Sequence, residues 1–387
     1  MNKRLKLLPM LAVLVAVIAS PVSSVQAAAP PGPYFNGFEQ NTNGWFGVSG
    51  STIARTPSGA SSTYASGIQS SSGGWHARLG MGSNLHCVNG GGVQDYFPGP
   101  RTNWGGYSST FPEGGYKTAV DLYLDTNWAQ TNLPDRRFDW SSAINQPDGT
   151  HRRDFAFNAG TLGATFVVSA SNNANRCGAF PENPGRDPFV IAASGWYTFS
   201  HTFTGQQGGP LTVTLSITQK STGLVLKTWV LSDPTDIIGL TVGGNRYGWF
   251  VQNEIDQLAI DNSLRTGLCR GGGGEGDVED NNSGKHGHAR FNGNGCEGGA
   301  QGGNVEENDQ GSNDNFQSTG VNSATFTTAE ESQTMTMLGT GTHNGMPVAF
   351  TMVAVDHGTI APASFSLILS DGYAIAGPLV TGSVSIP

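Results

Sequence analysis

The chain has 387 residues, the length of about two domains. It contains 56 glycines, only 13% charged residues, and a net charge of −9. A negatively charged chain repels phosphate backbones, so we expect no nucleic-acid partner. The composition also has few helix formers and many turn formers, which disfavours a mainly helical fold.

Residues 1–27 have the order of features typical of a secretory signal peptide. A positively charged start is followed by an apolar run at 7–19 and by small residues at 25–27. The alternative is an uncleaved anchor helix, but the run is shorter than the roughly 20 residues that span a bilayer. We therefore expect a secreted, extracellular protein without a transmembrane span.

Four cysteines are present, namely Cys87, Cys177, Cys269 and Cys296. An even number in an exported chain favours disulfides over metal ligands, and four cysteines allow three pairings. We expect one bridge within each domain, Cys87–Cys177 and Cys269–Cys296. The alternative is that the thiols are free and buried.

Residues 34–265 consist of short β-branched and aromatic segments separated by Gly, Pro, Asn and Asp. Several segments alternate with period two, for example 116–125 and 211–217, which indicates strands with one buried face. Many short strands with frequent turn signals are typical of a sandwich or jelly roll. We expect an antiparallel, all-β first domain here.

Residues 270–284 begin with a glycine run and continue with an acidic, Asn-containing stretch, a composition typical of a flexible linker. Residues 285–387 then contain five strand-like segments. Asn344-Gly345 and Asp371-Gly372 are strong hairpin-turn pairs. We expect a smaller antiparallel β domain after the linker.

Residues 34–265 resemble the concanavalin-A-like lectin and glucanase group of secreted bacterial domains. The segments that carry the resemblance are Phe-Asn-Gly-Phe-Glu at 35–39, Gly-Trp at 44–45, 120–125, 151–155, 244–250, and Leu-Ala-Ile-Asp-Asn at 258–262. The resemblance implies a jelly roll with a carbohydrate-related function. The chain lacks the Glu-x-Asp-x-x-Glu strand of the glucanases in this group, because its only glutamates between 34 and 265 are Glu39, Glu113, Glu182 and Glu254.

Residues 285–387 resemble a small β domain found at the C-terminal end of exported bacterial proteins with choice-of-anchor regions. The matching segments are 289–291, 339–342 and 364–367. This group implies no catalytic chemistry.

Many jelly rolls join their first and last strands through a hard cation, and Glu39 and Asp261 occupy the corresponding positions. Carboxylate oxygens suit Ca²⁺. The resemblance therefore implies one structural calcium ion held by both residues. The alternative is that the two carboxylates accept hydrogen bonds or cap turns.

Sugars are held by aromatic faces and by planar polar groups that orient their hydroxyls. Alternation places Tyr247 with Trp249 on one face of a predicted strand, and two further predicted strands carry polar faces. The candidate ligand-binding residues are Trp104, Tyr107, Asp121, Tyr123, Asp125, Arg137, Arg152, Asp154, Tyr247 and Trp249. Trp104 and Tyr107 lie in a glycine-rich loop and are expected to be exposed. The alternative is that the polar residues form solvated strand faces with ion pairs such as Arg152–Asp154.

The sequence therefore predicts a secreted, non-catalytic protein that binds a polysaccharide or a cell-surface glycan, with no prediction of oligomeric state. One alternative is a polysaccharide-cleaving enzyme of the same fold, either a hydrolase using Asp121, Asp125 and Asp154 or a lyase using Tyr123, His151 and Arg152. A second alternative is an extracellular structural or matrix protein without a ligand.

Overall fold

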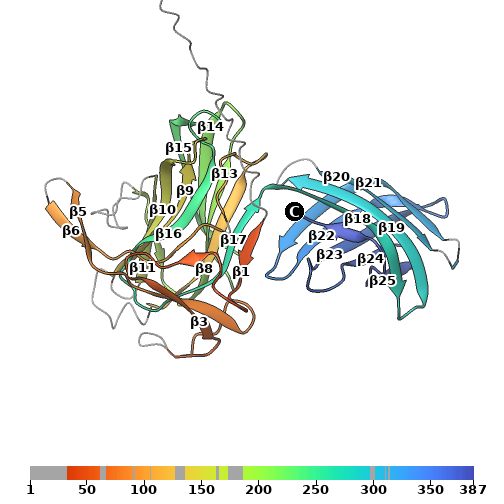
Figure 1. The fold of residues 1–387 in the computed structure, drawn as a ribbon, viewed down its shortest axis with the longest axis horizontal. Coiled ribbons are helices and arrows are strands. Elements are labelled where there is room, and N and C mark those ends of the chain that lie inside the picture. The colour runs from red at the N-terminus through yellow and green to blue at the C-terminus, as the bar shows by residue number, and fades with distance from the viewer. Residues whose placement is uncertain are drawn as a thin grey trace, which may run out of the picture.

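Alternating apolar and polar residues give strands throughout the chain, and these strands build two lobes joined at β18 (Cys269–Asp280) (Figure 1). The computed structural model describes residues 33–61, 67–89, 92–104, 106–126, 136–162, 165–172, 186–296, 301–309, 311–312 and 314–387. The predicted signal peptide, Cys177 and the side chain of Cys87 lie outside this part, so the Cys87–Cys177 bridge stays a prediction. Within the described ranges, no helix has the length and apolar character needed to cross a bilayer.

The first domain contains two large antiparallel sheets. The eight-stranded sheet has, in spatial order, β15 (Val225–Ile237), β14 (Pro210–Gln219), β13 (Gly195–Thr204), β8 (Tyr116–Leu124), β17 (Leu258–Gly267), β4 (Trp75–Gly80) and β3 (Thr52–Pro57), with β1 (Tyr34–Asn36) also paired to β17. The seven-stranded sheet has β12 (Phe189–Ile191), β11 (Thr165–Ser171), β10 (His151–Leu162), β9 (Arg137–Asn145), β16 (Gly244–Asn253), β7 (Arg101–Thr102) and β2 (Trp45–Phe46). A separate hairpin is formed by β5 (Leu85–Asn89) and β6 (Gly92–Tyr96).

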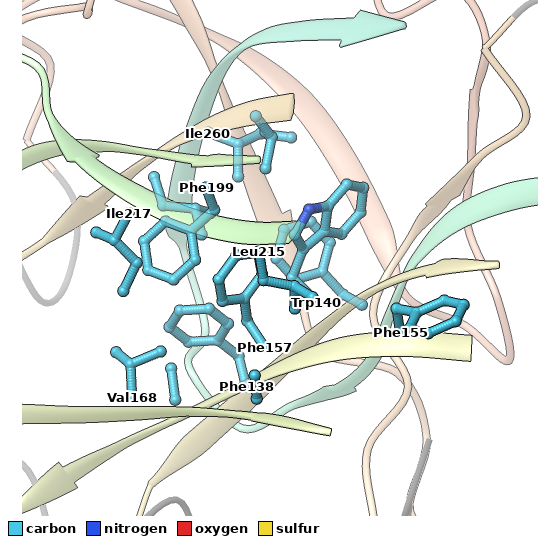
Figure 2. Close-up of a cluster of buried hydrophobic side chains, with 14 of the residues drawn as sticks. Phe138, Trp140, Phe155, Phe157, Val168, Phe199, Leu215, Ile217 and Ile260 are labelled. Carbon is cyan, nitrogen blue, oxygen red and sulfur yellow. The ribbon is translucent and has the colours of Figure 1, made fainter. Parts of the chain in front are cut away.

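Both sheets contribute to a single core, which makes this domain a sandwich. Figure 2 shows Phe138 and Phe157 of the seven-stranded sheet beside Phe199, Leu215 and Ile217 of the eight-stranded sheet. Phe157 and Phe199 meet edge to face with ring centroids 4.9 Å apart. Each strand of this core therefore has one apolar face turned inward and one face turned outward.

The second domain is a nine-stranded antiparallel sheet. Its spatial order is β25 (Ala374–Pro378), β24 (Ser364–Leu369), β23 (Met346–Asp356), β22 (Gln333–His343), β21 (Asn315–Thr328), β20 (Gln301–Asp309), β19 (Lys285–Cys296), β18 and β26 (Ser383–Ser385). The sheet curls until Leu379, just after β25, bridges Val278 of β18. It encloses a separate core with Phe291, Met337 and Phe350 among its members. The predicted all-β class, a sandwich followed by a smaller antiparallel domain, is confirmed.

The predicted disulfide Cys269–Cys296 is confirmed, and it joins two directly opposed residues of β18 and β19. The prediction of a flexible linker at 270–284 was wrong, because β18 pairs with β19 over its whole length. The second domain therefore begins at Cys269. A glycine run tolerates close approach of neighbouring chains, and here the run lies between β19 and β26.

Candidate functional site

The candidate site lies on the outward face of the seven-stranded sheet. In β9, Phe138 and Trp140 point into the core, so Arg137, Asp139 and Ser141 point to the opposite face. In β16, Phe250 points inward, and Tyr247 and Trp249 are both partly exposed. The two-residue period of the strands thus separates the aromatic residues that face the core from the outward face, which carries the polar residues together with Tyr247 and Trp249.

Four polar residues on this face lie directly opposite one another across four adjacent strands. Asn158 of β10 pairs in register with Ser169 of β11 on one side and with Asp139 of β9 on the other, and Asp139 pairs with Gln252 of β16. We call Ser169, Asn158, Asp139 and Gln252 the polar row. All four side chains are buried.

The polar row carries more hydrogen-bonding groups than its neighbours satisfy. Asp139 Oδ2 accepts from Arg137 at 3.0 Å, and Asn158 Oδ1 accepts from Arg186 at 2.7 Å. Burial raises the pKa of Asp139, and the nearby Arg137 opposes that rise only in part. Three buried atoms, Asp139 Oδ1, Asn158 Nδ2 and Ser169 Oγ, have no hydrogen-bond partner among the described residues. Buried polar atoms of this kind are commonly satisfied by ordered water.

An aromatic cleft lies at the other edge of the same sheet. Its lining consists of Phe46, Arg101, Asn103, Tyr107, Gly149, Arg246 and Tyr247. Phe46 is 46% exposed and Tyr107 is 54% exposed. The volume of about 240 Å³ is below the roughly 300–1,000 Å³ of pockets for whole drug-sized ligands, so it suits one unit of a longer chain.

Strand register and one tight turn position the lining of the cleft. Phe46 of β2 pairs with Arg101 of β7, and Arg101 pairs with Trp249 of β16. Gly149, in the β9–β10 turn, has a φ of 84°, and a Cβ at this position would lie 3.3 Å from the ring of Tyr107. Arg246 donates a hydrogen bond to the carbonyl of Gly149 and so spans the cleft from β16 to this turn.

The ring of Tyr247 contacts two other rings, and one of these, His151, is held in place by the carboxylate of Asp154. His151 stacks on it with ring centroids 6.2 Å apart and an interplanar angle of 8°, and Trp249 meets it edge to face at 6.0 Å. His151 Nε2 in turn lies 2.8 Å from Asp154, which also accepts from Ser141 at 2.7 Å. Asp154 and Trp249 therefore act on the cleft by fixing the ring of Tyr247.

The outward face brings together five of the ten predicted ligand-binding residues. Tyr107 and Tyr247 line the cleft, Trp249 and Asp154 support it, and Arg137 contacts the polar row. Tyr107 is exposed as predicted.

The other five do not contribute to this face. The expectation that Trp104 is exposed was wrong, because its side chain is 1% exposed and packs in the core. Arg152 pairs with Asp236 of β15 at 2.8 Å, and not with Asp154 as the alternative had it. Asp121 and Tyr123 lie on the outward face of the eight-stranded sheet, and Asp125 follows them at the end of β8.

Asp121 belongs to a satisfied network on that opposite sheet. It is buried, it lies 2.7 Å from Lys220 Nζ, and it accepts from Thr198 at 2.5 Å and from Asn262 at 2.8 Å. Both oxygens of this carboxylate are thus engaged by the protein, which fits a structural role better than a ligand site.

Glu39 and Asp261 hold the two sides of one loop, residues 71–75. Glu39 accepts from the backbone N–H groups of Gly74 and Trp75 at 3.1 Å, and Asp261 accepts from those of Ser71 and Ser72 at 2.9 and 3.2 Å. These N–H groups point positive hydrogens at the oxygens that a cation would need, which favours the alternative of hydrogen-bonded carboxylates over a shared Ca²⁺. The described residues also contain no group of three His, Cys, Asp or Glu suited to a metal ion. The calcium ion itself stays a prediction.

Several residues of the site were not predicted from the sequence, namely Phe46, Arg101, Asn103, Arg246 and Asp139. Asp139 could have been found, since the alternation that selects Arg137 selects it as well. Phe46 and Arg101 lie on strands of two residues, which have no detectable period.

No protein-family model matches this chain, and no curated protein is detectably similar to it in sequence.

Proposed function

We propose that this protein is an exported, non-catalytic glycan-binding protein and that the aromatic cleft holds one sugar unit of a polysaccharide. The observation that carries the proposal is the lining of the cleft. It combines the rings of Phe46, Tyr107 and Tyr247 with the planar side chains of Arg101 and Asn103. Sugar C–H faces pack on such rings, and planar donors orient the hydroxyls.

One further feature supports the proposal. The disulfide Cys269–Cys296 suits an oxidising compartment, as export by the sequence at 1–27 would provide.

The two catalytic sets considered from the sequence are not assembled. Asp121 lies on the outward face of the sheet opposite to that of Asp154, so the pair does not flank a common bond. Tyr123 is likewise on the other sheet from His151. Paired carboxylates for glycoside cleavage must lie within about 9.5 Å of each other. This finding removes those sets and favours the binding function over the enzyme alternative.

A pull-down on cellulose, chitin, xylan and polygalacturonate tests the proposal, followed by titration calorimetry with soluble fragments of any polymer that binds. Tyr107→Ala and Tyr247→Ala are each expected to weaken binding about tenfold, because each removes a stacking surface worth roughly 1–1.5 kcal/mol. Leu240→Ala is the control, since Leu240 is 72% exposed and is not part of the cleft lining. Failure of every polymer to bind, or binding by the tyrosine variants equal to wild type, would contradict the proposal.

A further inference from the structure

The charge of the cleft is opposite to the charge of the chain. The whole protein has a net charge of −9, whereas the cleft lining contains Arg101 and Arg246 and no carboxylate. The acid closest in sequence to the lining is Asp148, which accepts two hydrogen bonds from Thr150 within the same turn. The cleft is therefore a local cationic site on an anionic molecule.

Within the part of the chain that the structure describes, neither arginine of the cleft has an acidic partner. Arg101 is exposed at the outward side of β7, and no carboxylate of the described residues lies within ion-pair distance of it. Arg246 donates to a backbone carbonyl and lies 5.9 Å from the centroid of the Tyr247 ring.

Three other arginines on this sheet do have carboxylate partners. Arg137 pairs with Asp139 at 3.0 Å, Arg152 pairs with Asp236 at 2.8 Å, and Arg153 pairs with Asp233 at 2.8 Å. The sandwich thus pairs three arginines of β9 and β10 with carboxylates and leaves the two in the cleft without a carboxylate partner among the described residues. A guanidinium presents a planar set of donors that matches carboxylate and sulfate oxygens.

We propose that the polysaccharide bound in the cleft is anionic, with a carboxylate or sulfate group that contacts Arg101 and Arg246 while the sugar ring packs on Tyr247 and Tyr107. This inference rests on the proposed glycan-binding function and adds the chemical class of the ligand. The two sources of negative charge share the same recognition chemistry, so the experiment separates them.

Titration calorimetry with matched polymer pairs tests the inference. Polygalacturonate is compared with its fully methyl-esterified form, and dextran sulfate is compared with dextran. The charged member of a pair is expected to bind at least about tenfold more tightly, and its affinity is expected to fall with added salt. Preference within the first pair assigns a carboxylate, and preference within the second pair assigns a sulfate.

Arg101→Gln is the decisive variant, because this exposed side chain makes no hydrogen bond or ion pair with the described residues. It is expected to lose most of the preference for the charged polymer, and Arg101→Lys is expected to restore part of it. Arg290→Gln is the control with the same charge change, since Arg290 is exposed in the second domain.

The failures of the two proposals are distinguishable. Equal binding of charged and uncharged polymers, with loss in Tyr247→Ala, overturns the anionic ligand and leaves glycan binding intact. Binding of the charged polymers that is reduced equally by Arg101→Gln and Arg290→Gln also overturns it, because the attraction would then be a property of the whole chain. Absence of binding to all four polymers and to the earlier panel contradicts glycan binding itself.

Discussion

At the scale of single residues, two buried carboxyl groups have pKa values far from the usual range. Burial, together with the nearby Asp121, raises the pKa of Asp261 to about 7 in the first domain. Burial also raises the pKa of Glu307 to about 7 in the second domain, where Tyr373 donates to Glu307 Oε2 at 3.0 Å. Desolvation disfavours the charged form of a carboxyl group, so both groups hold a proton more tightly in the folded state.

This difference in proton binding between the folded and unfolded states decides whether the two groups make stability rise or fall with pH. Between about pH 4 and pH 7 each of these two carboxyl groups binds more protons in the folded protein than in the unfolded chain, so the contribution of each group to stability falls as the pH rises through this window. We expect Asp261→Asn to remove the contribution of this group to the slope, so that stability falls less, or rises more, with pH than in the wild type, because asparagine does not titrate. Chemical denaturation at a series of pH values, followed by tryptophan fluorescence of the first domain, measures the slope.

Glu307→Gln provides the matched comparison, since it removes a group with a similar pKa from the other domain. It should leave unchanged the part of the slope that Asp261→Asn removes. A wild-type slope that persists in Asp261→Asn would show that this carboxyl is not the source of the pH dependence.

At the scale of elements, β18 shows why the composition of residues 270–284 led to the wrong prediction of a linker. Its acids face basic residues of β19 in strict register, with Glu275 opposite Arg290, Asp277 opposite His288, Glu279 opposite His286, and Asp280 opposite Lys285. His288 lies 2.8 Å from Asp277, and that contact raises the pKa of His288. Opposite charges across a strand pair stabilise a sheet. A comparison of the acidic segment with the basic segment that follows it would have indicated a hairpin.

The glycines of β18 provide a direct test of strand against linker. A Cβ at position 274 would lie 2.7 Å from the ring of Phe291 and 2.7 Å from the carbonyl of Ser383, whereas one at 271 would have no neighbour closer than 3.5 Å. We expect Gly274→Ala to destabilise the second domain by roughly 1–3 kcal/mol through overpacking, and Gly271→Ala to be nearly neutral. Urea denaturation of both variants measures the difference. If both substitutions changed the free energy of unfolding by equally small amounts, the result would contradict the close packing of this segment as a strand.

The fold was more predictable than the site, and the reason is the length over which each signal extends. The strands at 116–124 and 210–219 carry full alternation over nine or ten residues, and the turn pair Asn344-Gly345 joins β22 to β23 as predicted. The site depends instead on which outward faces share a sheet. Asp121 and Asp154 have equivalent local patterns, yet they lie on opposite sheets because of the strand order, which no local pattern encodes.

At the scale of the whole molecule, the two domains are joined closely. Only Leu268 separates β17 from β18, and it is buried, with its N–H donating to Gly115 at 2.9 Å. A second connection comes from Glu330, in the β21–β22 turn, whose carboxylate accepts from the N–H groups of Glu39 and Gln40 at 3.0 Å each. The same short segment of the first domain thus contacts the loop at 71–75 and the second domain.

We expect Glu330→Ala to uncouple the unfolding of the two domains. Loss of two hydrogen bonds to a charged, partly exposed group costs about 2 kcal/mol, and this cost falls on the contact between domains. Differential scanning calorimetry should show broader or separated transitions. Glu331→Ala is the control, since the adjacent side chain is exposed. Identical calorimetric profiles for both variants and wild type would contradict a coupling role for Glu330.

The one-residue junction has a mechanical consequence. A polymer held in the cleft and a surface bound by the second domain would be rigidly connected, because only one residue lies between the last strand of the first domain and the first strand of the second. Tension on the polymer would therefore be transmitted directly to the contacts of Leu268 and Glu330 between the lobes.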